Sequence, residues 1–100
     1  MRTLTHHAIQ EIVAERERVI TEEGRDAAND DRYTGGELAC AAAAYALGHF
    51  RNPRILEMVR NLWPWAQEWW KPTTRRRNLI KAGALIVAEL ERLERKGIVS

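Results

Sequence analysis

The chain has 100 residues, of which 45% are hydrophobic and 30% are charged. This length fits a single domain, residues 1–100, and the composition is too apolar for a disordered chain. The single cysteine, Cys40, excludes an internal disulfide and a zinc site built from several thiols. A domain this small buries only a modest core, so we expect self-association into a homo-oligomer.

The small net charge of +2 is unevenly distributed along the chain. Residues 1–40 carry nine acidic and five basic side chains, whereas residues 41–100 carry five acidic and eleven basic ones. A basic second half suits an anionic partner, or else a complementary face within the fold or between two copies. We see no signal peptide, and the longest apolar run, residues 38–47, is too short to span a bilayer. We therefore expect a cytoplasmic protein with no membrane contact.

The first third of the chain predicts one long helix followed by a loop. Five apolar residues at helical spacing predict a helix over residues 5–23, with Gly24 as its stop. These residues are Ile9, Ile12, Val13, Val19 and Ile20. The polar residues 25–33 predict a loop.

The middle of the chain predicts two further helices. Thr34 and Glu37 have the spacing of a capping box, so we predict a helix over residues 35–48 whose buried side is nearly all alanine. Asn52, which is followed by a proline, predicts the start of a short third helix. This helix must end before Pro64, because a proline disfavours helical geometry at the residue that precedes it.

The last predicted helix begins after Thr73 or Thr74 and runs to about residue 96, where Gly97 stops it. Its predicted core stripe consists of Leu79, Gly83, Ile86, Leu90 and Leu93. The pattern as a whole predicts an all-α fold, a compact bundle of three long helices and one short helix. An irregular tryptophan-rich segment precedes the last helix.

This segment combines four tryptophans with a run of basic residues. Indole faces stack on bases, and arginine side chains and helix N-termini bind phosphate. Three arginines in the first turn of a helix oppose its dipole, and a bound anion would offset that cost. We therefore predict a ligand site formed by Trp65, Trp69, Trp70, Lys71, Arg75, Arg76, Arg77 and Lys81. In the alternative interpretation the tryptophans form a core or a lid, and the arginines pair with Glu15, Glu22 or Asp31.

A second candidate site is acidic. Carboxylates that converge in a helical bundle can hold magnesium for phosphate chemistry. The candidates here are Glu15, Asp31 and Glu37, with Glu23 and Asp30 close to them in the sequence. The alternative is that Glu37 caps a helix and that the other carboxylates are solvated. We expect no other cofactor, because the chain has no nucleophile motif, phosphate-binding loop or dinucleotide fingerprint.

Four segments are distinctive: AERER with EEG (residues 14–18 and 22–24), DDRYTGGELACAAAAYAL (30–47), WPWAQEWWKP (63–72) and RRRNLIKAGALIVAELERL (75–93). With these segments, which cover most of the chain, the sequence resembles a family of small proteins and protein ends from tailed phages and prophages. That family has no settled activity. Val19 stands where the family usually has a glutamine and Arg25 where it has an aromatic residue, which implies a different ligand preference if either position contacts a ligand.

More loosely, acidic first and second helices before KAGALIVAELERL resemble the all-helical nucleoside triphosphate pyrophosphatases of the MazG type. Those proteins bind magnesium through paired E-x-x-E and E-x-x-D motifs. Here Glu11 and Glu15 have a different spacing, and the last helix has no E-x-x-D. The resemblance therefore implies nucleotide binding more than hydrolysis.

We hypothesise a phage-encoded protein that captures a nucleotide-like or otherwise phosphorylated small molecule without converting it. A sponge for an immune signalling nucleotide, acting against host defence, would fit this description. One alternative is a magnesium-dependent nucleotide pyrophosphohydrolase that uses Glu15, Asp31 and Glu37. Another is an inhibitor that binds a host defence protein through its tryptophans and arginines. Nucleic-acid binding is the least expected, because the net charge is small and no recognition motif is present.

Overall fold

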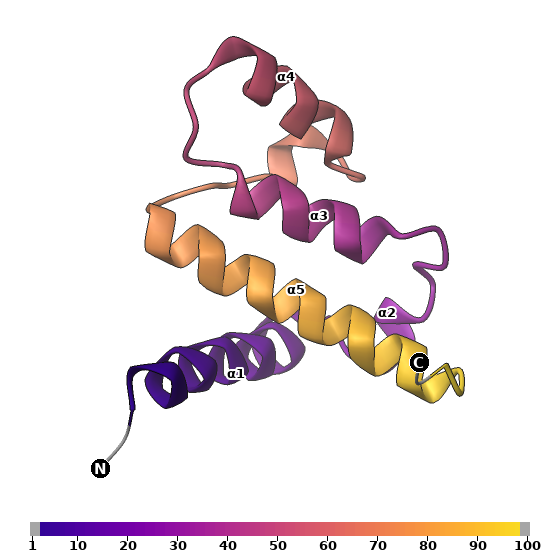
Figure 1. Ribbon diagram of the computed structural model, residues 1–100. Coiled ribbons are helices and arrows are strands. Elements are labelled where there is room, and N and C mark those ends of the chain that lie inside the picture. Colours follow the sequence, from indigo (N-terminus) through magenta and orange to yellow (C-terminus); the bar gives the residue numbers. More distant parts are fainter. Residues whose placement is uncertain (1–2, 99–100) are drawn as a thin grey trace.

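The computed structural model describes residues 3–98 as a chain of helices (Figure 1). In chain order the elements are α1 (Leu4–Glu23), α2 (Ala27–Asp30), α3 (Glu37–Ala46), α4 (Pro53–Leu62), the 3₁₀ helix η1 (Gln67–Trp69) and α5 (Arg75–Arg95). The predicted all-α fold class is confirmed. Within residues 3–98, no helix could serve as a membrane-spanning segment.

The ends of the longer helices follow the capping signals in the sequence. Side-chain oxygens of Thr3, Asn52 and Thr74 accept hydrogen bonds from first-turn amides of α1, α4 and α5. Gly24 closes α1 with a φ of 69°, in the left-handed region that a residue without a Cβ adopts readily. The predicted helix starts at Asn52 and Thr74 and the predicted stop at Gly24 are therefore confirmed.

The segment between α1 and α3 differs from the prediction in two ways. Residues 25–33, for which the sequence predicts a loop, contain the single helical turn α2. Thr34 does not cap α3, because α3 begins only at Glu37, after Gly36 in the left-handed region at a φ of 88°. The Glu37 carboxylate accepts a hydrogen bond from the amide of Gly35 instead, at 2.7 Å. Two adjacent glycines let the chain turn here, so the helix starts later than the predicted capping box requires.

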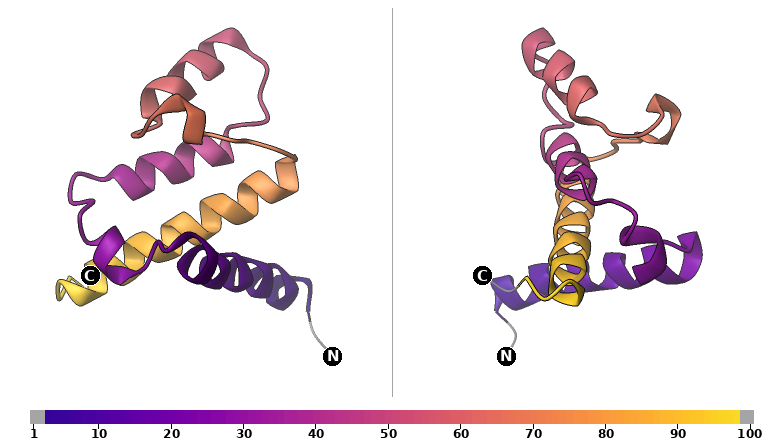
Figure 2. Two further views of the ribbon diagram at one scale, coloured as in Figure 1. Left: turned by 180° about the vertical axis from the view of Figure 1, so that it is seen from behind. Right: turned by 90° about the vertical axis from the view of Figure 1, so that its right-hand side faces the viewer.

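Helices α4, α3, α5 and α1 are stacked in that order (Figure 2). The core lies between α3 and α5 and also includes Val59 of α4 and Trp63, and most of its buried hydrophobic side chains are small. They are Leu38, Ala41, Ala42, Ala44, Tyr45, Val59, Trp63, Ala82, Ala84 and Ala88. Alanine on both facing surfaces lets the two helices approach closely, since the distance between helix axes depends on the side chains at the contact.

The predicted core stripe of α5 is wrong for three of its five members. Leu79, Ile86 and Leu90 are exposed to solvent. The buried residues of α5 are instead Asn78, Ala82, Ala84, Ala88 and Arg92. The alanine surface of α3 allows a close approach of small side chains, and α5 turns its alanines and Leu85 toward the core while Leu79, Ile86 and Leu90 remain outside.

Helix α1 buries charged side chains. Ile9 and Val13, two of the five apolar residues that predict this helix, are exposed, whereas Glu15 and Arg16 are buried. Buried charges are costly unless they are paired and hydrogen-bonded. Both residues have such partners, and these partners belong to the site described next.

Candidate ligand-binding site

A cavity of about 200 Å³ lies beside the tryptophan-rich segment. The C-terminal part of α1 and the η1 segment project from the same side of the α3–α5 layer (Figure 2, right), and residues of both line the cavity. The aromatic lining residues are Tyr33, Tyr45, Trp63, Trp65 and Trp69. The charged lining residues are Arg16, Arg18, Arg25, Lys71, Lys81, Glu15, Glu23 and Asp30. Aromatic surfaces beside a small excess of cations suit a flat anionic ligand.

The cavity contains half of the predicted ligand site. All eight predicted residues belong to the described part of the chain, and Trp65, Trp69, Lys71 and Lys81 line the cavity. The other four residues do not line it: they are Trp70, Arg75, Arg76 and Arg77. The structure therefore separates the tryptophans and lysines from the run of three arginines.

Ring contacts join four aromatic side chains into one wall of the cavity. The ring centroids of Tyr33 and Trp65 are 5.2 Å apart, those of Trp65 and Trp63 are 5.1 Å apart, and those of Trp63 and Tyr45 are 5.5 Å apart. The last two pairs meet edge to face, a favoured geometry for aromatic rings. The Trp63 indole N–H donates to the carbonyl of Ala66 at 3.0 Å, which holds the chain after Pro64 in place. This aromatic wall is thus preformed.

The remaining two tryptophans have different environments. Trp69 is 56% exposed and lies at the edge of the cavity. Trp70 packs against the core, and its indole nitrogen is buried without a hydrogen-bond partner among the described residues. The two interpretations of the tryptophans thus overlap: Trp63 belongs to the core and also lines the cavity, Trp70 packs only against the core, and Trp65 and Trp69 line the cavity.

The three arginines at the start of α5 contact side chains of other elements. The pairs are Arg75 with His49, Arg76 with Glu11, and Arg77 with Glu15. Burial and the charges of Arg75 and Arg51 lower the pKa of His49, which favours a neutral ring that accepts a hydrogen bond from Arg75. The alternative in which the arginines pair with acidic residues thus describes Arg77, whose partner Glu15 is one of the three candidates, and also Arg76, whose partner Glu11 is not.

Helix α1 supplies charged side chains to the cavity that the predicted ligand site does not include. The buried Arg16 donates to Asp30 at 2.8 Å, to Glu91 at 2.7 Å and to the carbonyl of Arg25 at 3.3 Å. These three hydrogen bonds join α1 to α2, to α5 and to the turn after α1. They fix the position of α1 beside the cavity and its rotation about its own axis.

The neighbouring Glu15 is held by two arginines. Arg18 donates two hydrogen bonds to its carboxylate, at 2.9 and 2.8 Å, and Arg77 contacts it from α5. Burial raises the pKa of Glu15, but the hydrogen bonds from Arg18 and Arg77 outweigh burial and hold the pKa below its ordinary value. Glu15 is therefore a charged carboxylate whose oxygens already accept hydrogen bonds from Arg18 and Arg77.

Two lysines of the cavity have no such partner. Lys71 Nζ lies 5.9 Å from the centroid of the Trp69 ring, and Lys81 Nζ lies 5.3 Å from that of Tyr45. Within residues 3–98, neither ammonium group forms an ion pair with a carboxylate. Burial and the nearby Arg77 lower the pKa of Lys81, as expected for a cation that would gain from an anionic neighbour.

The acidic candidates do not form a metal centre. Glu15 is bound to arginines, Asp31 accepts hydrogen bonds from Arg95 at 3.1 and 2.8 Å, and Glu37 accepts a hydrogen bond from the amide of Gly35. Among residues 3–98, no three His, Cys, Asp or Glu side chains are arranged to hold a metal ion. Asp31 and Glu37 also do not line the cavity, so the structure does not bring the three predicted residues together.

The ligand-site prediction missed the cavity residues that α1 supplies and three of the aromatic lining residues. The missed cations are Arg16, Arg18 and Arg25, and the missed aromatic residues are Tyr33, Tyr45 and Trp63. One signal was present in the sequence: Ile12, Glu15, Arg16 and Val19 share one face at helical spacing, and two opposite charges interrupt that otherwise apolar stripe. Such a stripe indicates a buried ion-pair network and a polar site beneath the helix.

The geometry of this cavity is the basis for a functional assignment. No protein-family model, no curated protein and no solved structure matches this chain.

Proposed function

We propose that this chain is a binding protein that captures a small anionic molecule with a flat ring, such as a mononucleotide, in the cavity. The observation that carries the proposal is the pair Lys71 and Lys81. Both ammonium groups line a cavity with an aromatic wall, and neither has a carboxylate partner within residues 3–98. An anionic ligand would supply the missing counter-charge at two points.

The volume of the cavity indicates the size of the ligand. Pockets for drug-sized ligands measure about 300 to 1,000 Å³, whereas this cavity measures about 200 Å³. It suits one aromatic ring and the phosphate nearest to it, with the remainder of the ligand in solvent. A single copy would therefore favour a mononucleotide over a cyclic dinucleotide.

The lining residues have separate roles in this proposal. The ring of the ligand stacks against Trp65 or Trp69, because indole faces accept any base. Lys81, on α5, and Lys71, after η1, hold the phosphate from two elements. Arg25 lies 5.7 Å from the centroid of the Trp65 ring and would close the side of the stack.

The state of the acidic residues favours capture over hydrolysis. A magnesium-dependent pyrophosphohydrolase needs carboxylate oxygens that are free to bind the metal. The cavity carboxylates Glu15 and Asp30 accept hydrogen bonds from Arg18 and Arg16, at distances between 2.8 and 2.9 Å. The phage resemblance suggests a setting for capture, namely removal of a host signalling nucleotide.

Isothermal titration calorimetry with AMP, ATP, ADP-ribose, a cyclic dinucleotide and inorganic phosphate tests the proposal, with tryptophan fluorescence recorded in parallel. We expect saturable binding of a mononucleotide and quenching of the tryptophan emission. Lys81→Met should weaken binding at least tenfold, because a hydrogen bond to a charged group contributes about 1.5–3 kcal/mol. Lys96→Met, which removes a lysine outside the cavity, is the matched control and should bind like the native chain.

Three results would each reject the proposal. The first is the absence of binding by every member of the panel. The second is equal loss of affinity in Lys81→Met and Lys96→Met. The third is release of pyrophosphate or phosphate that requires magnesium, which would replace capture by hydrolysis.

A further inference from the structure

One face of the α1–α5 pair exposes large apolar side chains. On α5, Ile86 is 51% and Leu90 is 60% exposed, and Leu79 is exposed one turn before Gly83. These residues and Gly83 repeat at intervals of three and four, so they lie on one face of the helix. Exposed leucines are common singly, but a continuous apolar stripe marks a surface that binds a partner.

Helix α1 extends this surface at the point where it crosses α5. A Cβ on Gly83 would lie 2.7 Å from Cδ1 of Ile12, so the two helices touch there. Ile9 and Val13, near Ile12 on α1, are exposed and four residues apart, so they share one face of that helix. We call the five residues Ile9, Val13, Leu79, Ile86 and Leu90 the apolar face.

The exposed area of the chain is large for a monomer. A folded monomer of 11.5 kDa is expected to expose about 5,800 Å². This chain exposes 6828 Å², roughly 1,000 Å² more than that expectation. A stable interface buries about 800 Å² on each partner, so the excess is large enough to be covered by one partner of ordinary size.

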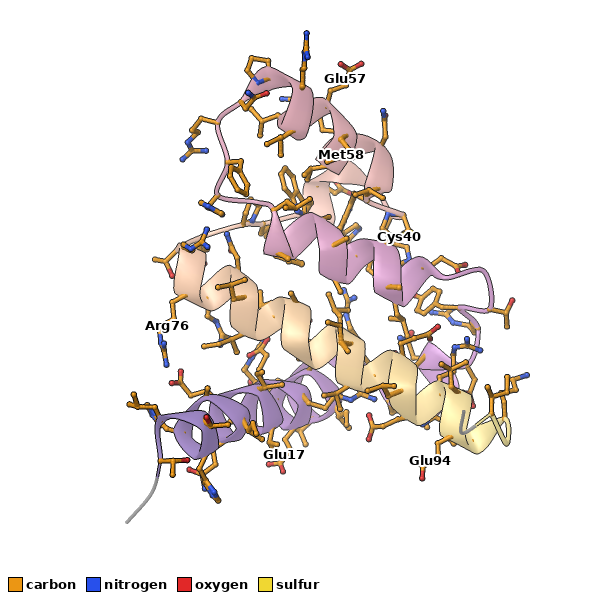
Figure 3. All side chains as sticks on the ribbon, viewed as in Figure 1. Glu17, Cys40, Glu57, Met58, Arg76 and Glu94 are labelled. Carbon is orange, nitrogen blue, oxygen red and sulfur yellow. The ribbon has the colours of Figure 1, made fainter. Side chains whose placement is uncertain are left out.

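The charges at the two ends of α5 select a second copy of this chain as the partner. Arg76 and Glu94 are eighteen residues apart, which is about five helical turns, so they lie on the same side of α5. They project from its opposite ends (Figure 3). Arg76 pairs with Glu11 of its own chain but keeps 66% of its side chain exposed, and the Glu94 carboxylate has no ion-pair partner within residues 3–98. Two antiparallel copies of α5 would place each Arg76 beside the Glu94 of the other copy.

We propose that the apolar face is the interface of a symmetric dimer, in which α5 of one copy lies antiparallel to α5 of the second. Ile86 is close to the midpoint between Arg76 and Glu94, so it lies near the two-fold axis and meets the Ile86 of the second copy. Leu79 and Leu90 flank it, and Ile9 and Val13 line the outer edges. The dimer accounts for apolar residues that periodicity assigns to a core but that one copy leaves exposed.

The interface also bears on the cavity. Helix α1 packs on α5, and it supplies Glu15, Arg16 and Arg18 to the cavity. A second copy that covers Ile9 and Val13 would hold α1 against α5 from the side opposite the cavity. The dimer stands independently of the proposed ligand, since its residues do not line the cavity.

Sedimentation equilibrium of the full chain tests the dimer. We expect the apparent mass of the native chain to rise toward twice the 11.5 kDa of one copy as the concentration increases through the micromolar range. The double variant Ile86→Glu, Leu90→Glu should be a monomer with a retained helical circular dichroism spectrum. Met58→Glu, which changes an apolar residue on α4 that is 47% exposed, is the matched control and should remain dimeric.

A charge exchange tests the antiparallel orientation. Glu94→Arg places like charges together at both ends of the interface and should weaken the dimer about three- to tenfold, since exposed pairs contribute modestly. Adding Arg76→Glu to this variant restores opposite charges across the interface, although it also breaks the exposed pair with Glu11, and should recover part of the lost affinity.

The native chain provides a measurement that does not depend on variants. Hydrogen exchange at amides of residues 9–13 and 79–90 should slow as the protein concentration rises, whereas α4 should not change. A native chain that sediments as a monomer would overturn the proposal. So would an assembly that persists in the Ile86→Glu, Leu90→Glu variant, or exchange protection that does not depend on concentration.

Discussion

Replacing Arg16 by methionine removes the guanidinium group that joins α1 to its neighbours, while much of the apolar stem is kept. The loss would leave Asp30, which is 2% exposed, without its partner at 2.8 Å. Breaking a buried ion pair by removing one partner costs about 3–5 kcal/mol, because the remaining charge is buried without compensation. Glu91 adds little to this cost, since 44% of its side chain is exposed. A small domain has a free energy of unfolding of about 5–15 kcal/mol, so Arg16→Met should remove a large share of the stability.

Urea unfolding followed by circular dichroism measures this loss. Because Asp30→Asn removes the orphaned charge, the double variant should be more stable than the sum of the two single effects predicts, by about 2 kcal/mol or more. The matched control is Arg95→Met, which breaks the solvent-exposed pair with Asp31 and should have a much smaller effect. Equal losses for Arg16→Met and Arg95→Met, or strict additivity with Asp30→Asn, would refute the view that a buried ion pair holds α1 in place.

Three further predictions follow from the same contacts. Gly83→Ala should lower the free energy of unfolding by about 1 kcal/mol, because its Cβ would lie 2.7 Å from Ile12 Cδ1 and overpacking outweighs the better helix propensity of alanine. In an Ile12→Ala background the same change should raise the free energy of unfolding. A loss of stability in both backgrounds would contradict this explanation. Because the pKa of Glu15 is lowered in the folded chain, its contribution to stability is present above its ordinary pKa and is lost on acidification. The difference in free energy of unfolding between the native chain and Glu15→Gln should therefore shrink from about pH 6 to about pH 3, and a constant difference would argue against a charged Glu15. Because the pKa of Lys81 is also lowered, mononucleotide binding should weaken as the pH rises from about 8 to about 10. Lys81→Arg should shift this loss of affinity to higher pH. Identical pH profiles of affinity for the native chain and Lys81→Arg would exclude Lys81 as the phosphate ligand.

The structure also explains why acidic and basic residues are so unevenly distributed along the sequence. Most of the long-range ion pairs join the acidic first part of the chain to α5: Glu11 with Arg76, Glu15 with Arg77, and Asp31 with Arg95. The complementary-face interpretation therefore holds within one copy. What remains for an anionic ligand is the smaller positive charge of Lys71 and Lys81.

The local features of this protein could be read from the sequence. Asn52 and Thr74 as helix caps, Gly24 as a stop and the irregular segment after Trp63 all depend on hydrogen bonds and backbone preferences within a few residues. Such interactions are determined by the neighbouring sequence, so the all-α class and the order of the long helices follow from it. The sequence also predicted that Trp65, Trp69, Lys71 and Lys81 lie in one site, because these residues are close in sequence and on adjoining elements.

Only the tertiary structure decided which face of each helix is inside. Periodicity assigns Leu79, Ile86 and Leu90 to a core, but the alanines of α3 select the alanine side of α5, and the larger residues are left on the surface. In the same way, the partners of Arg16 come from residues 30 and 91, which no local pattern brings together. The free energy of packing two helices depends on both surfaces at once, and a sequence pattern describes only one of them at a time.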